Sequence, residues 1–225
     1  MNKLVLFDID GTLTSAAVGH IEAHAVAYQK VFGKYGSIYM IDNSGKTDRL
    51  ITKEVLQKLG IDDATIEAKM SEHLGVMEEY YVSIKSHLSP KVLPGVVALL
   101  EKLSTDENVL LGNVTGNLSG IAATKLEIAG IKEFFKLGGF GEESYDRADL
   151  VRNAIERARG LGFVGDDIYV VGDTPSDITA GIAAGIKTIG VTTGTYDQQA
   201  LEAAGATAVL TDLTDIEAFD RVTSL

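Results

Sequence analysis

Short apolar runs rich in β-branched residues, separated by helical stretches, constrain the fold of this chain most strongly. Five strong runs are KLVLFD, NVLLGNVT, DIYVVGD, KTIGVTT and TAVLTD, and a weaker one is EFFKLGGF. Continuous apolar runs of this length are typical of strands buried on both faces of a parallel sheet. Helical patterns alternate with them over 96–103, 118–129, 149–159 and 177–184. We therefore predict an α/β fold, a Rossmann-like parallel sheet with helices on both faces.

One long region interrupts this alternation near the beginning of the chain. Its apolar residues recur at three- and four-residue intervals, which predicts helices, and it holds no strong strand pattern. The segment SPKVLPG, with two prolines and a glycine, then marks the return to alternation. The sequence thus predicts an inserted helical cap domain at 15–91, within an α/β core made of 1–14 and 92–225.

Composition narrows the classes of partner. The 225 residues include 32 acidic and 20 basic side chains, for a net charge of −12. A surface this acidic repels nucleic acids and anionic lipid, so neither is an expected partner. No apolar run approaches the roughly 18–20 residues of a membrane span, and MNKLVLF does not resemble a signal peptide. There is no cysteine, which fits a reducing compartment. We expect a cytoplasmic monomer.

Polar residues come directly after three of the predicted strands. They are Asp8 and Asp10, then Thr115, Gly116 and Asn117, then Asp173 and Asp177. Buried carboxylates cost free energy unless they are paired or bind a metal. Because the carboxyl ends of parallel strands meet at one edge of the sheet, where ligands bind, we expect these residues to form one site.

The chemistry of these groups indicates a phosphate substrate. Several carboxylates held together repel one another unless a divalent cation shares them, and Mg²⁺ prefers oxygen ligands. A hydroxyl and backbone N–H groups at a helix start bind anions. In such a site one carboxylate can attack phosphorus, while a second protonates the leaving oxygen and later activates water.

The motifs DIDGT, VTGN and GDTPSD, in this order, resemble those of the haloacid dehalogenase-like hydrolases over essentially the whole chain. The predicted helical insertion resembles the cap that this family inserts after its first motif, and SGKTDR at 44–49 resembles the cap segment of phosphoglycolate phosphatase-like members. The resemblance implies a Mg²⁺-dependent phosphatase. Its expected substrate is a small phosphate monoester, such as phosphoglycolate or a similar metabolite, hydrolysed through an aspartyl-phosphate intermediate.

The resemblance also implies residue roles. Asp8 is the expected nucleophile and Asp10 the general acid/base. The expected Mg²⁺ ligands are the Asp8 and Asp173 carboxylates and the Asp10 backbone carbonyl, with Asp177 acting through the water shell. The expected phosphoryl-binding residues are Thr115, Gly116 and Asn117.

The family usually has a lysine ahead of the strand that leads to its fourth motif, which is GDTPSD here. This sequence lacks it, because no lysine lies between Lys136 and Lys187. Arg147, at the predicted start of a helix, is the expected replacement, since a guanidinium can bind phosphoryl oxygens bidentately. Arg152 is the second choice. The alternative for Arg147 is a surface pair with a neighbouring aspartate.

Three cap residues are candidate substrate contacts. Lys46 and Arg49 could bind a substrate anion, although a solvated helix start explains both equally well. His20 lies twelve residues after Asp8, where sugar-phosphate mutases of the family carry a catalytic histidine; a place on a helix surface is the alternative. The other three histidines show no metal-ligand spacing.

Two other functions stay open. A sugar-phosphate mutase keeps both aspartates of DIDGT, so the motifs do not separate it from a phosphatase. A non-catalytic binding protein on the same fold is less favoured, because degenerate members of the family usually lose a motif carboxylate.

Overall fold

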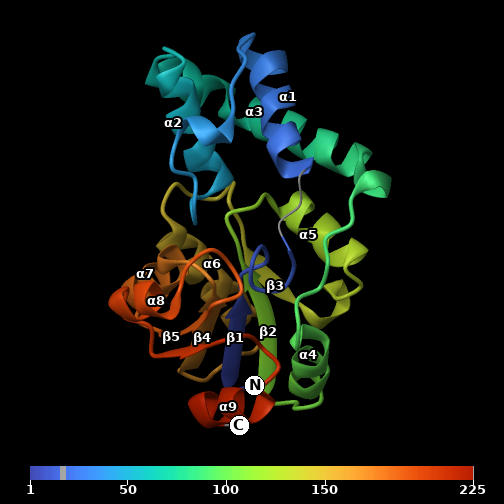
Figure 1. The fold of residues 1–225 in the computed structure, drawn as a ribbon, viewed down its shortest axis with the longest axis vertical. Coiled ribbons are helices and arrows are strands. Elements are labelled where there is room, and N and C mark those ends of the chain that lie inside the picture. The colour runs from blue at the N-terminus through green and yellow to red at the C-terminus, as the bar shows by residue number, and fades with distance from the viewer. Residues whose placement is uncertain (16–18, 225) are drawn as a thin grey trace.

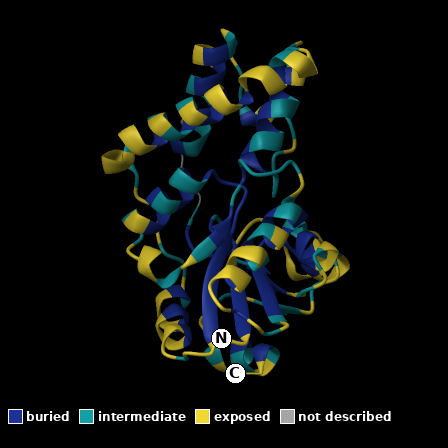
Figure 2. Cartoon of the chain, turned by 180° about the vertical axis from the view of Figure 1, so that it is seen from behind, coloured by how far each residue is buried: buried dark blue, intermediate teal, exposed yellow. Residues whose placement is uncertain are grey.

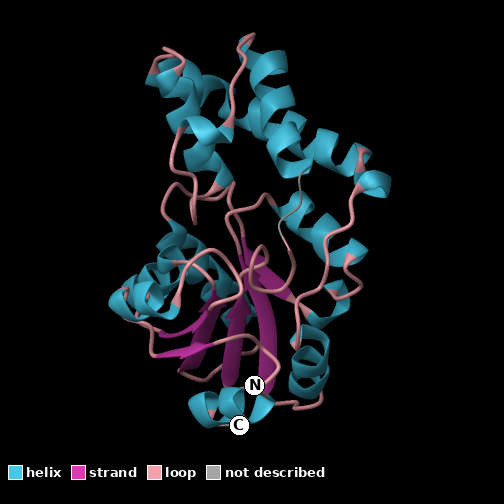
Figure 3. Cartoon of the chain, in the orientation of Figure 1, coloured by secondary structure: helices cyan, strands magenta, loops and turns pink. Residues whose placement is uncertain are grey.

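The computed structural model describes residues 1–15 and 19–224. Within them, six parallel strands form one sheet in the order β3-β2-β1-β4-β5-β6 (Figures 1 and 3). The strands are β1 (Lys3–Phe7), β2 (Val109–Val114), β3 (Leu137–Gly139), β4 (Asp167–Gly172), β5 (Lys187–Val191) and β6 (Ala208–Leu210). The prediction of a parallel α/β sheet is confirmed. The weaker run EFFKLGGF forms only the short edge strand β3, because residues 132–134 make a 3-10 turn.

The central strand β1 is buried along its whole length, and its side chains alternate between the two faces of the sheet. Val5 and Phe7 pack on one face against α4 (Val96–Ser104), α5 (Ser119–Ile128) and α9 (Ile216–Thr223). Leu4 and Leu6 pack on the other face against α6 (Arg147–Gly160) and α7 (Pro175–Ala183). This two-sided burial is the reason the strand is apolar at consecutive positions. Figure 2 shows the central strands of the sheet as buried, within the α/β part of the molecule.

Helices cover both faces of the sheet, as predicted. Those of the α/β part are α4 (Val96–Ser104), α5 (Ser119–Ile128), η3 (Lys132–Phe134), α6 (Arg147–Gly160), α7 (Pro175–Ala183), α8 (Gln198–Ala203) and α9 (Ile216–Thr223). In the described part of the chain, we find no helix that combines the length and the apolar character needed to cross a membrane.

A separate helical layer follows β1 in the chain and lies over the carboxyl edge of the sheet (Figure 1). It consists of α1 (Gly19–Phe32), η1 (Ile38–Met40), α2 (Asp48–Lys58), α3 (Asp63–Ser83) and η2 (Lys85–His87). Its apolar side chains form a cluster of their own, which also includes Leu118 and Ile121 from the core. Residues 16–18, which the predicted insertion includes, lie outside the described residues.

Hydrogen bonds join this helical layer to the chain segment that follows β2. The Asp48 N–H donates to the Gly116 carbonyl at 2.8 Å, and the Leu118 N–H donates to Asp48 Oδ2 at 3.0 Å. The Gly120 N–H donates to a Glu78 carboxylate oxygen at 2.9 Å. The layer is therefore docked on the segment predicted to bind phosphate.

Candidate functional site

A cleft of about 480 Å³ lies between the helical layer and the carboxyl edge of the sheet. Most of the expected site residues line it, namely Asp8, Asp10, His20, Lys46, Thr115, Gly116, Asn117, Arg147 and Asp173. They come from the ends of β1, β2 and β4, from the start of α6 and from the helical layer. The topology thus gathers in one cavity residues that are far apart in the sequence.

Arg147 links two of the carboxylates that the sequence places together. Its Nη2 atom lies 2.7 Å from Asp8 Oδ1 and 2.5 Å from Asp177 Oδ1. Arg152, the second choice, instead pairs with Asp149 on the exposed side of α6, at 2.7 Å. Arg147 is the first residue of α6, so the helix start aims its side chain into the cleft. The expected alternative, a surface pair with a neighbouring aspartate, is therefore wrong for Arg147.

One guanidinium does not neutralise the three carboxylates around it. Asp8, Asp173 and Asp177 offer oxygens that all lie within 4.8 Å of one another. Burial and the neighbouring carboxylates raise the pKa of Asp8 well above its usual value, against the opposing effect of Arg147. Burial and Asp177 likewise raise the pKa of Asp173 to about 7. A buried, all-oxygen donor set with excess negative charge fits a hard divalent cation such as Mg²⁺.

The loop after β1 has a backbone that only glycine adopts without strain. Gly11 has φ +84°, and a Cβ there would overlap the Asp173 carboxylate. Its carbonyl accepts a hydrogen bond from the Thr193 hydroxyl at 2.5 Å. The next residue, Thr12, donates its hydroxyl proton to Asp173 Oδ1 at 3.1 Å. This close approach brings the DIDGT and GDTPSD motifs together.

Asp177 serves two purposes with its two carboxylate oxygens. Thr174 is the N-cap of α7, with Pro175 as its first residue, and Asp177 Oδ2 accepts the Thr174 N–H at 3.1 Å in a capping box. The other oxygen, Oδ1, is the one that faces Arg147. The helix-start chemistry readable in DTPSD therefore positions a carboxylate at the site.

Asp10 belongs to a second network, on the other side of the cleft. Its Oδ2 accepts hydrogen bonds from Lys125 Nζ at 2.5 Å and from Asn117 Nδ2 at 2.8 Å. The Asn117 side chain also contacts Lys125 through Oδ1, at 2.8 Å, and Thr115 through Nδ2, at 2.6 Å. The Asn117 N–H, expected to bind phosphate, donates to Thr115 Oγ1 at 3.3 Å.

The network sets the charge of Asp10. Burial alone would raise the pKa of this carboxyl, but Lys125 and His20 outweigh burial and lower the pKa. Lys125, whose side chain is 1 % exposed, was not predicted as a site residue. The sequence pattern could have identified it, because Lys125 lies four residues after the buried Ile121 and therefore falls on the apolar face of its helix.

The cap candidates differ in where they point. His20 lines the cleft, with Nε2 2.9 Å from Asp48 Oδ1. Lys46 also lines it, but its ammonium pairs with Glu54 at 2.6 Å.

Arg49 is not among the residues that line the cleft, contrary to expectation. Its guanidinium lies over the Tyr145 ring, 4.8 Å from the ring centroid, and 3.4 Å from a Glu67 carboxylate oxygen. The packing of α2 against α3 turns this side chain away. The sequence analysis also missed Asp48 and His24, because an aspartate in a first helical turn and a histidine on a helix are both unremarkable.

Known proteins resemble this chain in sequence and in fold. The family model "Haloacid dehalogenase-like hydrolase" matches residues 5–191. The phosphoglycolate phosphatase of Rhodospirillum rubrum is 25% identical, over 96% of this chain and 90% of that protein. A predicted phosphatase from Clostridium acetobutylicum has a TM-score of 0.71 at 22% identity, covering 100% of both chains. A β-phosphoglucomutase from Clostridium difficile has the same TM-score at 18% identity, covering 100% of this chain and 98% of that one. The chain belongs to the haloacid dehalogenase-like hydrolases.

Proposed function

We propose that this protein is a Mg²⁺-dependent phosphatase that hydrolyses a small phosphate monoester through an aspartyl-phosphate formed on Asp8. The observation that carries this proposal is the setting of Asp8. Its buried carboxylate lies in the cleft beside Asp173 and Asp177, held by Arg147, while Asp10 lines the same cleft in a separate hydrogen-bond network. This is the arrangement required by a nucleophile with a distinct proton donor.

In the first step, an Asp8 oxygen bonds to phosphorus while the bond from phosphorus to the ester oxygen breaks. Asp10 delivers a proton to that leaving oxygen. In the second step, water attacks phosphorus, Asp10 takes the proton from water, and the bond between phosphorus and Asp8 breaks to release phosphate. Arg147 and the Thr115 hydroxyl stabilise the charge on the phosphoryl oxygens.

The two aspartates need opposite protonation states in the first step. Asp8, Asp173 and the Asp10 backbone carbonyl would hold Mg²⁺, with Asp177 acting through water, and the ion would supply positive charge that favours ionised Asp8. Lys125 favours the ionised form of Asp10, which suits the second step. In the first step, the negative charge of the bound substrate phosphate raises the pKa of Asp10 and lets it hold a proton.

The proposal includes a cap at 15–91 that closes on a core made of 1–14 and 92–225. The separate apolar cluster of the helical layer supports this division. Hydrogen bonds from Leu118 and Gly120 to the layer hold it over the cleft. Closure over the cleft would exclude bulk water from the phosphoryl group. A monomer in the cytoplasm is part of the same proposal, supported by the absence of cysteine and the high negative charge.

Phosphoglycolate or a similar small metabolite is the proposed substrate. The cleft of about 480 Å³ suits a small molecule, and a phosphoglycolate phosphatase is among the relatives that match nearly the whole chain. His20 and residues 43–46 form the part of the cleft wall that the leaving group of the substrate would contact.

A sugar-phosphate mutase is the second candidate. The observation that favours it is the position of His20, which lines the same cleft as Asp10 and comes from the helical layer. Incubation with β-glucose 1-phosphate separates the two, since a mutase forms glucose 6-phosphate and a phosphatase releases inorganic phosphate.

The decisive experiment measures phosphate release from phosphoglycolate, sugar phosphates, nucleoside monophosphates and an aryl phosphate, with and without Mg²⁺. We expect metal-dependent release that Asp8→Asn abolishes. The matched control is Asp166→Asn, which changes an exposed aspartate paired only with Arg159 on the surface. Release that survives Asp8→Asn contradicts the mechanism, and absence of any turnover in folded, Mg²⁺-binding protein favours a non-catalytic role.

A further inference from the structure

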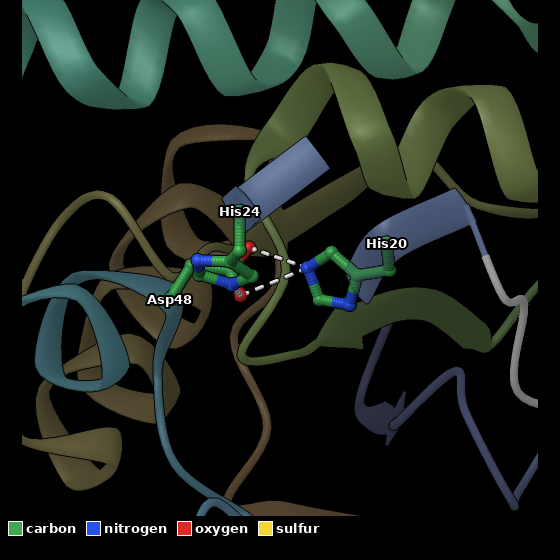
Figure 4. A group of neighbouring side chains, drawn as sticks. All are labelled: His20, His24 and Asp48. Carbon is green, nitrogen blue, oxygen red and sulfur yellow. Dashed lines mark hydrogen bonds and ion pairs between the residues drawn. The ribbon is translucent and has the colours of Figure 1, made fainter. Parts of the chain in front are cut away.

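We propose that His20, His24 and Asp48 form a binding site for a divalent transition-metal ion such as Zn²⁺, separate from the carboxylate cluster around Asp8. The three side chains converge (Figure 4), and two of them, His20 and Asp48, line the cleft. The mechanism above uses neither His24 nor Asp48.

The geometry of the three donors supports a shared ion. His20 and His24 lie one turn apart on α1 and therefore project from the same face, while Asp48 is the first residue of α2. His20 Nε2 lies 2.9 Å from Asp48 Oδ1 and 3.1 Å from Oδ2, and His24 Nε2 lies 3.2 Å from Oδ1. All three donor atoms lie within 4.8 Å of one another.

These separations are close to those in a zinc site. With bonds of about 2.0–2.1 Å in tetrahedral geometry, neighbouring ligand atoms are about 3.3 Å apart. The two histidine-to-aspartate separations therefore lie within a few tenths of an ångström of those around a bound ion. Two imidazoles and one carboxylate favour Zn²⁺ and related ions over Mg²⁺, which selects oxygen ligands.

The hydrogen bonds of the cluster show where its protons lie. His20 Nε2 and His24 Nε2 both lie within hydrogen-bond distance of the Asp48 carboxylate, which accepts, so each of these nitrogens carries a proton. Metal binding through Nε2 would therefore displace that proton, which His24 can carry on Nδ1 instead.

Neighbouring groups can support the ligands. The Tyr28 hydroxyl oxygen lies 3.4 Å from His24 Nδ1, the ring nitrogen left over when Nε2 binds metal. In the metal-bound tautomer, Nδ1–H donates to that hydroxyl, as metal-bound histidines generally require. The Leu118 N–H donates to Asp48 Oδ2 and fixes the carboxylate.

One coordination position is left for a ligand from the cleft. The His20 side chain is 19 % exposed, whereas those of His24 and Asp48 are 0 % and 1 % exposed. The open side of the site therefore faces the cavity that also contains Asp10. Water or an oxygen of a bound molecule would complete the coordination.

The test titrates full-length protein with Co²⁺, a coloured substitute for Zn²⁺, while Mg²⁺ is kept in large excess to fill the carboxylate cluster. We expect one equivalent of Co²⁺ to bind with a visible absorption spectrum of nitrogen and oxygen coordination, and Zn²⁺ to displace it. His20→Ala and His24→Ala should each weaken binding at least tenfold. His87→Ala, which removes an exposed histidine of η2, should bind as the wild type does.

Three results would overturn the proposal. Wild-type protein could retain no Co²⁺ in the presence of Mg²⁺, or His20→Ala could bind as tightly as His87→Ala. Alternatively, Asp173→Asn could abolish the signal, which would assign the ion to the carboxylate cluster. If His24→Ala does not fold, the partly exposed His20 variant decides. The readout is binding, so this test is independent of whether the protein is a phosphatase.

Discussion

Lys125 Nζ lies 2.5 Å from Asp10 Oδ2, although 115 residues separate the two in the chain. The lysine side chain is 1 % exposed and that of the aspartate 26 %. A charge buried this deeply requires a partner, so each of the two depends on the other. Helix α5, which carries no residue expected from the family motifs, therefore controls the group that transfers protons.

Replacing Lys125 by methionine should destabilise the protein by about 3 kcal/mol, because Asp10 would keep a largely buried charge without its cation. The pKa of Asp10 should rise, since Lys125 is the main group that lowers it. The limb of the kcat/KM profile that reports Asp10 should then move to higher pH. Urea unfolding and the pH profile measure the two effects.

The control for Lys125 is the double variant Lys125→Met/Asp10→Asn. It removes both charges and should recover part of the lost stability while remaining inactive. Equal stability of Lys125→Met and wild type would show that the pair contributes nothing.

Replacing Arg147 by methionine should lower kcat/KM by about 10²–10³-fold, because the guanidinium both positions Asp8 and stabilises phosphoryl charge. Arg147→Lys should lose less, since it keeps the charge but cannot span Asp8 and Asp177 in the same way. Arg152→Met, on the same helix but exposed, is the control. The prediction fails if the two methionine variants hydrolyse substrate equally well.

Stabilisation by Mg²⁺ should depend on pH. The folded-state pKa of Asp173 is about 7, above its ordinary value of 3.8. Between these values the folded protein holds a proton that the unfolded chain has lost, so stability falls as pH rises through this range without Mg²⁺. The pKa of Asp8 is also raised in the folded protein, so Asp8 contributes a pH dependence of the same sign.

Adding Mg²⁺ should therefore raise Tm more at pH 8 than at pH 5, which thermal unfolding at both pH values measures. Asp173→Asn should reduce the increase, and Na⁺ at equal ionic strength should not reproduce it. The same increase at both pH values would argue against a metal site made of these carboxylates.

His73 provides an opposite pH dependence within the helical layer. Burial lowers the pKa of His73 to about 3, and in the described part of the chain neither ring nitrogen has a hydrogen-bond partner. Between this value and the ordinary 6.5, the unfolded chain binds a proton that the folded protein does not, so stability falls as pH decreases. The ring packs against Tyr28 and Phe32, with centroids 4.9 and 5.8 Å away.

His73→Phe should therefore leave stability at pH 7 within about 1 kcal/mol of wild type, because no partner is lost. It should lose less stability than wild type between pH 7 and pH 5, as urea unfolding at the two pH values would record. The exposed-site variant His87→Ala should keep the wild-type slope. Parallel slopes for His73→Phe and wild type would mean that His73 takes up its proton at the same pH in the folded protein as in the unfolded chain.

The parts of this protein that sequence predicted are those controlled by local pattern. Continuous apolar runs identify strands buried on two faces, and the motif aspartates follow those strands at fixed distances. Arg147 could be found because it occupies the first turn of a predicted helix near the sheet edge. Its partners Asp8 and Asp177 follow two strands whose carboxyl ends the parallel topology brings to the same edge of the sheet.

The parts that sequence did not predict depend on packing between distant helices. Lys125 looks like an ordinary helical lysine until α5 is placed beside the loop that carries Asp10. Asp48 lies 28 residues after His20 and meets it only because α2 starts next to α1. Arg49 was a candidate for contact with substrate or for a solvated helix start, and it turns toward Glu67 because α3 packs along α2.

The central position of β1 has a consequence for how activity is acquired during folding. Its neighbours β2 and β4 come from residues 109–114 and 167–172, so two long loops must close before Asp8 has both strands beside it. Contacts this distant in the chain form slowly compared with helices. Until then β1, whose side chains are apolar from Leu4 to Phe7, has unpaired backbone N–H and C=O groups along both edges, which favour aggregation. On dilution from denaturant, recovery of hydrolysis should therefore lag behind recovery of helical circular dichroism.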